Sequence, residues 1–305
     1  MTDANHQKYR LGELESGRDS VLIREKLATD LAKLMPTAFF DHQRIVPRAA
    51  LMKTLPKLSR LFDHMLDTVM KSSCALCDRA ASDVCCVDCW RQIQHCQLDV
   101  AGGIEQISLS FGQGSEQSTT RLVCWGAYQG SLKRAIANLK YGQQEALGNR
   151  LGRELGRLWI AANAMNQDRS QKPFPKSTLV VPIPLHAEKQ ARRGYNQAEL
   201  IAAGFCDETG LRLSPSLLER VRSTEAQFGL SATKRELNLT GAFRINRTVL
   251  RRYRLHPAQP MPHPCVILVD DIYTTGATIR AAADCLSQQR IPVIDVAAVS
   301  RPRHG

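Results

Sequence analysis

Two adjacent carboxylates and a run of small, hydroxylated residues lie in the stretch VILVDDIYTTGAT, from Val266 to Thr278. Its first four residues are aliphatic without alternation, which is typical of a strand buried on both faces. Asp270 and Asp271 follow where that strand would leave its sheet. The turn after them opens a helical pattern over 279–289 and contains Thr274, Thr275, Gly276, Ala277 and Thr278.

This order of residues predicts a site for a phosphate joined to a sugar. In open α/β sheets ligands lie at the carboxyl ends of strands, and a helix N-terminus offers N–H groups and a favourable dipole to phosphate. Gly276 lets the backbone come close, and the threonine hydroxyls add donors. Ionised carboxylates accept hydrogen bonds from sugar hydroxyls. We therefore expect a ribose 5-phosphate here; a buried strand that ends in a solvated acidic turn is the alternative.

Four cysteines form two CxxC pairs, Cys74 with Cys77 and Cys86 with Cys89, and eight residues separate the pairs. This spacing is typical of a tetrahedral four-thiolate zinc site, in which Cys85 could replace Cys86 only by losing the two-residue spacing. Four thiolates leave no open position for catalysis, so zinc would be structural and would supply folding energy to a segment with little core. Paired disulfides or a redox CxxC are the competing interpretations.

Strands are expected to alternate with helices from Arg121 onward, which implies a mostly parallel α/β sheet. A second buried strand, LVVPIP, ends at Pro182 and Pro184. The basic segment HAEKQARRGYNQ follows it, and it would either hold pyrophosphate or form a solvated turn before a helix over 198–209. Further helices are expected over 131–139 and 145–160, and a last strand over 293–299.

The composition limits the class of protein. A chain of 305 residues has room for about two domains. Its net charge of +12 favours anionic partners such as phosphates or nucleic acid without choosing between them. The N-terminus has no apolar signal-peptide core, and no apolar run approaches the ~18 residues that a membrane span needs. We expect a cytoplasmic protein, in which cysteines are thiols or metal ligands.

We expect four regions along the chain. Residues 1–72 would be a helical or partly disordered extension, in which the periodic stretch from Leu51 to Met70 either packs on the main body or docks on a partner or membrane surface. Residues 73–98 would be the double zinc finger, 99–120 a polar linker and 121–305 the main domain. Within it, residues 219–254 hold nine Lys or Arg and three Glu. This basic segment predicts a lid over a polyphosphate, a nucleic-acid surface or a solvated face.

The motifs resemble known families. VILVDDIYTTGAT is similar to the binding signature of type I phosphoribosyltransferases, which use phosphoribosyl pyrophosphate (PRPP). Five features in order resemble the ComF (GntX-like) family of competence-associated phosphoribosyltransferase-like proteins: CxxC–CxxC, YQGSLKRAIANLKY, VVPIPLHAEKQARRGYNQAEL, RVRSTEAQFGLSATKRELNLTGAF and VILVDDIYTTGAT. The resemblance covers about residues 73–302. It implies a phosphoribosyltransferase-like sheet flanked by helices, preceded by a four-cysteine zinc module and the helical extension.

The resemblance also implies roles for residues. Asp270 and Asp271 would be catalytic and would bind the PRPP ribose, with Thr274 to Thr278 on its 5′-phosphate. Magnesium would be carried with PRPP. The expected pyrophosphate loop and hood contain Pro182, Pro184, Arg193, Asn196, Gln197, Arg222, Lys234 and Arg235.

The expected function is a PRPP-binding phosphoribosyltransferase associated with competence, DNA uptake and the use of imported DNA or nucleotide salvage. Its acceptor stays open, because few residues follow the last expected strand to build a base-recognition element. The alternative is a non-catalytic PRPP- or nucleotide-binding module that also binds single-stranded DNA or a DNA-uptake protein. Tyr253, which lies among Arg251, Arg252 and Arg254, motivates the DNA-binding alternative.

Overall fold

The computed structural model describes residues 72–110, 117–165, 175, 177–222, 241–254 and 264–303. From Ser72 onward these residues belong to one compact unit. The expected N-terminal extension up to residue 71, and Lys234 and Arg235 of the expected hood, lie outside the described residues.

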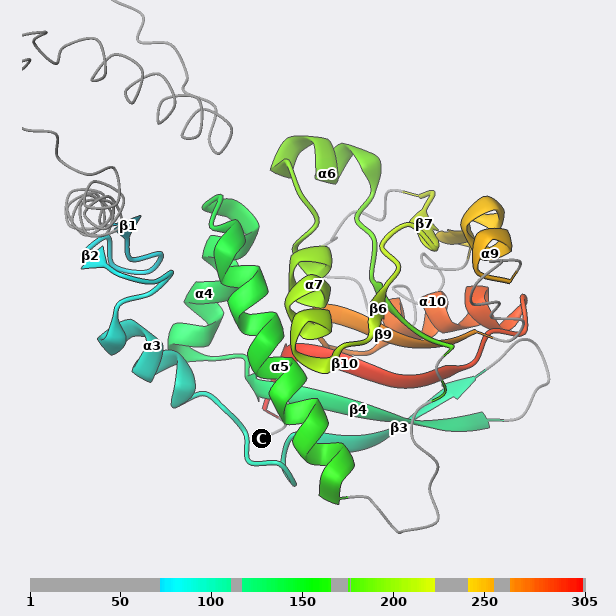
Figure 1. Cartoon of the computed structure of the whole chain (residues 1–305), viewed down its shortest axis with the longest axis horizontal. Helices are drawn as coiled ribbons and strands as arrows, with labels where there is room; N and C mark the ends of the chain where they lie inside the picture. Colours follow the sequence, from blue (N-terminus) through cyan, green and yellow to red (C-terminus); the bar gives the residue numbers. More distant parts are fainter. Residues whose placement is uncertain are drawn as a thin grey trace, which may run out of the picture. The chain divides into compact units, whose positions relative to one another are not determined.

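The helices and strands carry the labels of Figure 1. The helices are α3 (Val87–Gln94), α4 (Gly130–Tyr141), α5 (Glu145–Met165), α6 (Ala187–Arg193), α7 (Gln197–Thr209), α9 (Arg247–Arg254) and α10 (Ala277–Ser287). The strands are β1 (Ser72–Ser73), β2 (Ala80–Ala81), β3 (Ile104–Ser110), β4 (Gln117–Ala127), β5 (Thr178–Pro182), β6 (Arg212–Leu213), β7 (Leu218–Arg220), β8 (Phe243–Ile245), β9 (Cys265–Ile272) and β10 (Val293–Arg301).

A six-stranded sheet in the order β3-β4-β10-β9-β5-β6 forms the centre of this unit (Figure 1). Strands β4, β10, β9, β5 and β6 pair in parallel, and β3 alone pairs antiparallel, along β4. Two short antiparallel pairs, β1 with β2 and β7 with β8, lie outside it. The predicted mostly parallel α/β fold is therefore confirmed.

Alternate residues of the central strands enter two separate cores, because successive side chains of a strand point to opposite faces. In β9, Ile267 and Val269 pack in the core that also contains buried residues of α4, α5 and α7. Val266 and Leu268 pack in the other core, with residues of α9 and α10. Covering both faces explains why the strand carries no polar residue between Val266 and Asp270.

The assignment of residues 99–120 as a linker is wrong. All of β3 and the first residues of β4 come from this segment, and the register from Ile104↔Val123 to Ser110↔Gln117 joins them to the sheet. Polar residues such as Glu105 and Gln106 occur there because β3 is an edge strand, where one side of the ladder stays unpaired. Composition alone resembled that of a linker for this reason.

The expected hood, 219–254, is described only at its two ends. Its two ends contain β8, α9 and most of β7, and β7 pairs with β8 from Leu218↔Ile245 to Arg220↔Phe243. Residues 223–240 between them lie outside the described residues. No helix among the described residues is both long and apolar enough to cross a membrane.

Candidate functional site

Asp270 and Asp271 lie just before the last residue of β9, at the carboxyl end of the strand. Asp271 is 4% exposed, and Asp270 is partly exposed. The backbone N–H of Asp271 donates to Oδ1 of Asp270 over 2.8 Å, which fixes the direction of that carboxyl group. Burial, and then the charge of Asp271, raise the pKa of Asp270 well above its usual value. The two carboxyl groups therefore behave differently although they are neighbours in sequence.

Two cations that the sequence did not single out face this pair. Lys140, near the end of α4, forms an ion pair with the Asp271 carboxylate. Burial lowers the pKa of Lys140, but the charge and hydrogen bond of Asp271 together with the charge of Asp270 outweigh burial, and the net shift is upward. Arg220, in β7, is close enough to Asp270 for the carboxylate to raise its pKa against the larger lowering effect of burial. An anionic ligand at the aspartates would thus meet positive charge from two elements.

The turn after β9 has the conformation that a close approach to a ligand requires. Thr274 and Thr275 are exposed, and Gly276 is the N-cap of α10 with φ +73°. A Cβ at Gly276 would overlap the Tyr273 hydroxyl. Arg280, one turn into α10, donates from Nη1 to the carbonyl oxygen of Thr275 over 2.8 Å and braces the turn. Two exposed hydroxyl groups therefore lie just before the N-terminal end of α10.

A basic cavity of about 220 Å³ lies between the end of α4 and α6. Its lining contains four cations and no carboxylate: Lys140, Tyr141, Gln143, Lys189, Arg192, Arg193 and Tyr195. Tyr141 is 79% exposed, and the Arg193 guanidinium lies 5.5 Å from the centre of its ring. Because Lys140 lines this cavity and also pairs with Asp271, the cavity adjoins the aspartates.

Of the other residues expected in the pyrophosphate loop and hood, one lines the basic cavity and the others lie elsewhere. Arg193 reaches the basic cavity, and it donates to Oε1 of Gln197. Asn196 and Gln197 are buried, and Asn196 caps α7 by accepting from the Ala198 N–H over 3.1 Å. Asn196 also donates to the carbonyl oxygen of Ile183 over 3.1 Å, which fixes the loop after β5. Pro182 ends β5 beside Val269 of β9, and Pro184 lies in that loop; Arg222 is exposed just after β7.

The four cysteines of the CxxC pairs gather at one point. The Sγ atoms of Cys74, Cys77, Cys86 and Cys89 all lie within 4.8 Å of one another. Cys77 Sγ and Cys86 Sγ are 3.8 Å apart, which is about the edge of a tetrahedron with metal–sulfur bonds of ~2.3 Å. Cys85 is outside this group; burial raises the pKa of its thiol to about 12. The four-cysteine cluster can therefore hold a metal ion, and the arrangement suits tetrahedral zinc.

Donors around the four-cysteine cluster favour thiolates. Burial opposes the ionisation of Cys74, but backbone hydrogen bonds led by that of Cys86 outweigh it and lower its pKa to about 6. Arg79 donates from Nε to Cys77 Sγ over 3.3 Å and lowers the pKa of Cys77. The Nη2 group of Arg79 lies 3.7 Å from Cys86 Sγ and 3.2 Å from the Asp88 carboxylate. Four thiolates with one divalent cation carry two negative charges, and Arg79 offsets part of them.

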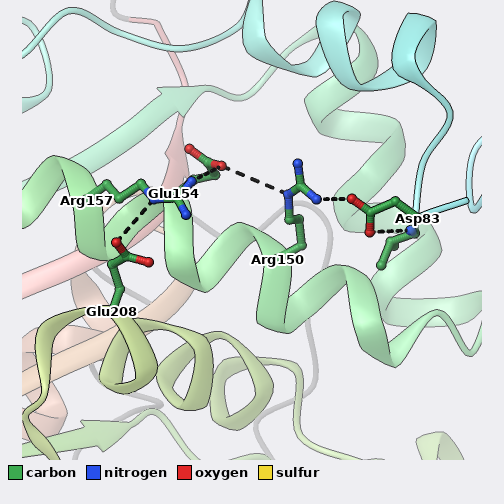
Figure 2. A network of polar contacts seen from close by, with 6 residues as sticks. Asp83, Arg150, Glu154, Arg157 and Glu208 are labelled. Atoms are coloured by element: carbon green, nitrogen blue, oxygen red, sulfur yellow. Dashed lines mark hydrogen bonds and ion pairs between the residues drawn. The ribbon is translucent and has the colours of Figure 1, made fainter. Parts of the chain in front are cut away.

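The cysteine-bearing segment packs directly on the α/β unit. Cys74, Cys89 and Ile93 share one core with Trp125 of β4 and Leu132 of α4. Figure 2 shows the polar part of this contact, in which Asp83 pairs with Arg150 of α5. The network continues within the α/β unit: Arg150 Nε lies 4.0 Å from Glu154, and Arg157 pairs with both Glu154 and Glu208 of α7. The Arg150 guanidinium also lies 4.3 Å from the centre of the Trp90 ring.

Three relatives describe what this chain resembles. Competence protein F of Haemophilus influenzae is 28% identical over 222 residues, which cover 71% of this chain and 90% of that protein. DNA utilization protein YhgH of Escherichia coli O6:H1 is 26% identical over 247 residues, 80% of this chain and 97% of that protein. Competence protein ComFC of Bacillus subtilis is 35% identical over 131 residues, 42% of this chain and 47% of that protein. These relatives are named for competence and for DNA utilization, and the chain is similar to all three. No family model matches it.

At these two sites, sequence reasoning missed Lys140, Arg220 and Arg79. Lys140 occurs at the end of an amphipathic helix, where a lysine is common for its favourable interaction with the helix dipole. Arg220 lay within a basic segment, and Arg79 lay between the CxxC pairs, where charged residues are ordinary. A search for charges complementary to the aspartates and the thiolates would have included these residues, but it could not have ranked them.

Proposed function

We propose that this protein, as a member of the ComF family, binds PRPP at the carboxyl end of β9 and acts as a phosphoribosyltransferase. One observation carries the proposal: the aspartate pair is followed in the chain by the turn that begins α10, and Lys140 joins the pair to a cavity with four cations. PRPP has a monophosphate, a ribose and a pyrophosphate in that order. The surface offers donors, carboxylates and cations in the same order.

Each part of PRPP has a candidate partner. The 5′-phosphate lies on the backbone and hydroxyl groups of Thr274 to Thr278, which include the two exposed threonines. Asp270 and Asp271 accept hydrogen bonds from the ribose hydroxyls. The pyrophosphate lies on the cavity side, where Lys140 and Arg193 neutralise it. Magnesium accompanies the pyrophosphate and keeps most of its ligands from substrate and water.

The transfer step needs little more than positioning and charge. The bond between C1 and the pyrophosphate oxygen breaks with its electron pair on pyrophosphate, through an oxocarbenium-like state related to that of glycoside cleavage. The negative charge of the aspartate pair offsets the positive charge that develops on the ribose. A nitrogen nucleophile then forms its bond to C1. The basic segment that begins at Arg222 would close over the site and exclude water.

We propose that the four-cysteine cluster holds a structural zinc ion. The spacing of the sulfur atoms fits four-coordinate zinc, and four protein ligands leave no position for a substrate. The ion would supply folding energy to a segment whose own strands have two residues each. Metal analysis of the purified protein should give one zinc per chain, and substituting Cys77 with serine should abolish it.

We further propose that the protein acts in the cytoplasm, in competence or in the use of imported DNA. The names of the relatives, competence protein and DNA utilization protein, support that role. A phosphoribosyltransferase there would serve the salvage of bases or nucleotides that the imported DNA yields.

Phosphorus NMR of the purified protein with PRPP and magnesium tests the transferase. Pools of nucleobases and amines are added in turn, and an Asp270→Asn variant serves as the control, because the neutral amide keeps the shape of the side chain. Pyrophosphate that appears with the native protein and one pool, but not with the variant, is the expected result. PRPP that binds Asp270→Asn as tightly as the native protein would contradict the proposed site.

The second candidate function is a non-catalytic module that binds PRPP or a nucleotide together with single-stranded DNA or a DNA-uptake protein. A specific observation favours the DNA part: the eight residues of α9 carry four arginines and no acid, and Arg247, Arg251 and Arg252 are exposed. Tyr253 is less suited to stacking a base than the sequence suggested, because it packs on the core and the Arg212 guanidinium lies 4.8 Å from its ring centre.

Salt dependence separates the two candidates. Changing Arg247, Arg251 and Arg252 together to glutamine should weaken binding of a single-stranded oligonucleotide and reduce the salt slope by about 0.7 for each phosphate that the protein no longer neutralises. PRPP binding should be unchanged in that variant. Oligonucleotide affinity and salt slope equal to those of the native protein would rule out α9 as the DNA surface. PRPP that binds but is not converted in the presence of any nucleobase or amine pool would favour the non-catalytic module.

A further inference from the structure

One helix, α4, contacts both the four-cysteine cluster and the aspartate pair. At the cluster, Asn138 donates from Nδ2 to the carbonyl oxygen of Ala75 over 2.6 Å. Arg134 donates from Nη2 to the carbonyl oxygen of Leu76 over 3.1 Å. Ala75 and Leu76 are the two residues between Cys74 and Cys77, so their carbonyl directions depend on the cysteines that flank them.

Lys140 lies two residues beyond Asn138 on the same helix. Its ammonium group is paired with the Asp271 carboxylate, and its side chain is only 20% exposed. It lies in the last turn of α4, where the helix has few further backbone hydrogen bonds to hold it. The position of this last turn therefore decides whether the ammonium group reaches Asp271.

Packing allows α4 little independent movement. Its buried residues Leu132, Ile136 and Leu139 share a core with Cys74 and Cys89. At the start of the helix, Ser131 Oγ donates to Oε1 of Gln92 in α3 over 3.0 Å. Because interiors are close-packed, a change in the loop between the first two cysteines is transmitted to the helix that packs against it.

We propose that Arg134 and Asn138 are positioning residues that couple the metal occupancy of the four-cysteine cluster to the Lys140–Asp271 pair. With metal bound, the loop between Cys74 and Cys77 presents two fixed carbonyl groups, and α4 holds Lys140 at the aspartates. Without metal, the two cysteines are released, the carbonyl groups lose their fixed direction and α4 loses the two hydrogen bonds that anchor it to that loop. Lys140 then withdraws, and the aspartate pair loses its nearest cation.

The cluster then has a role at the aspartate site although it touches neither carboxyl group. This inference does not depend on PRPP binding, because it concerns a pair of residues of the chain itself. It can therefore fail while the proposed transferase holds, and hold while the transferase fails.

The test uses the full-length, zinc-loaded protein and needs no PRPP. Carbon-13 NMR of labelled aspartate follows the titration of the Asp270 carboxyl group, whose pKa burial raises and Lys140 lowers, and whose signal is assigned with Asp270→Asn. Hydrogen exchange follows the amides of residues 271–276. Removal of zinc with a chelator should move the carboxyl titration to higher pH, because a carboxylate without its cation is harder to ionise. The amides should exchange at least about tenfold faster.

Variants separate the helix contacts from metal loss. Arg134→Ala combined with Asn138→Leu should reproduce both changes while zinc stays bound, and Arg134→Lys, which keeps a donor, should restore part of the native titration. If the double variant does not fold, Asn138→Leu alone gives a smaller change in the same direction. Arg150→Ala is the matched control, because it removes a contact of the same segment to α5 rather than to α4.

The coupling predicts that Arg150→Ala leaves the aspartate titration at its native position. An equal shift in Arg150→Ala would show general loosening of the unit and overturn the proposal. A titration and exchange that stay native after zinc removal, or in the folded zinc-bound double variant, would overturn it as well.

Discussion

At the scale of single residues, the two aspartates at the end of β9 have different environments. Asp271 is nearly buried and paired with Lys140, whereas the pKa of Asp270 is raised by burial and by the charge of Asp271. When a carboxyl group has a higher pKa in the folded state than in the unfolded state, the native state loses stability as pH rises. The loss begins at the unfolded pKa, near 3.9, and continues through the folded pKa. Asp270 therefore weakens the native state above that pH window, as residues at functional sites often do.

Substitution of each aspartate by asparagine should separate function from stability. Asp270→Asn removes a carboxyl group that resists ionisation, so we expect no loss of stability at neutral pH and a flatter pH dependence, with loss of PRPP binding. Asp271→Asn leaves Lys140 with a buried, unpaired charge and should cost about 3 kcal/mol. Urea unfolding between about pH 4 and 8 measures both. A loss of stability in Asp270→Asn as large as that in Asp271→Asn would contradict the distinction.

Gly276 is the second residue whose type the structure explains. Alanine there should cost about 1 kcal/mol for its positive φ and about 1–3 kcal/mol more for the overlap with Tyr273. Gly210→Ala is the control, because Gly210 has φ +69° and a Cβ there meets nothing within 4 Å. Denaturant unfolding should give the larger loss at Gly276; equal losses would mean that the turn yields without strain.

At the scale of elements, glycines let α5 and α7 lie unusually close. A Cβ at Gly152 would overlap the carbonyl oxygen of Ile201, and a Cβ at Gly204 would overlap that of Asn149. An alanine inside a helix normally stabilises it by about 1 kcal/mol relative to glycine. At Gly152 and Gly204 we expect alanine to destabilise the protein instead, because a backbone carbonyl group cannot move aside as a side chain can.

Gly152→Ala should therefore destabilise the protein by about 3 kcal/mol. Gly156→Ala should cost less, because the nearest atom to its Cβ would be the side-chain Cβ of Glu208, 2.9 Å away. Urea unfolding of both variants with the native protein measures the difference. A stabilising Gly152→Ala would show that the two helices separate at little cost.

At the scale of the whole described unit, the four-cysteine cluster and the sheet share one core. Removal of the metal should therefore lower the Tm of the unit by more than about 5 °C in one cooperative transition, because the cluster has no separate core to unfold alone. Cys77→Ser should behave in the same way. Cys206→Ser, which changes a cysteine outside the cluster, should not. Two separate transitions in calorimetry would contradict a shared core.

Local sequence determined the parts whose signal is short-range. The aliphatic run ending in Asp270 and Asp271 predicted a buried strand, and α4, α5 and α7 begin and end within a few residues of their expected bounds. The spacing of the CxxC pairs favoured Cys86 without excluding Cys85, and the four sulfur atoms that lie together include that of Cys86. These features depend on chain periodicity, on turn residues and on ligand spacing, all of which lie within a few residues of one another.

Only the tertiary structure decided which distant residues meet. Lys140 reaches Asp271 from a distant part of the chain, and β3 joins the sheet although its polar composition suggested a linker. Asn196 is a helix cap, although its motif suggested a pyrophosphate ligand. An ion pair, an edge strand and a buried cap depend on packing between segments far apart in the chain. Residue type and local spacing carry no record of that packing, so the sequence could supply the aspartates and not their partners.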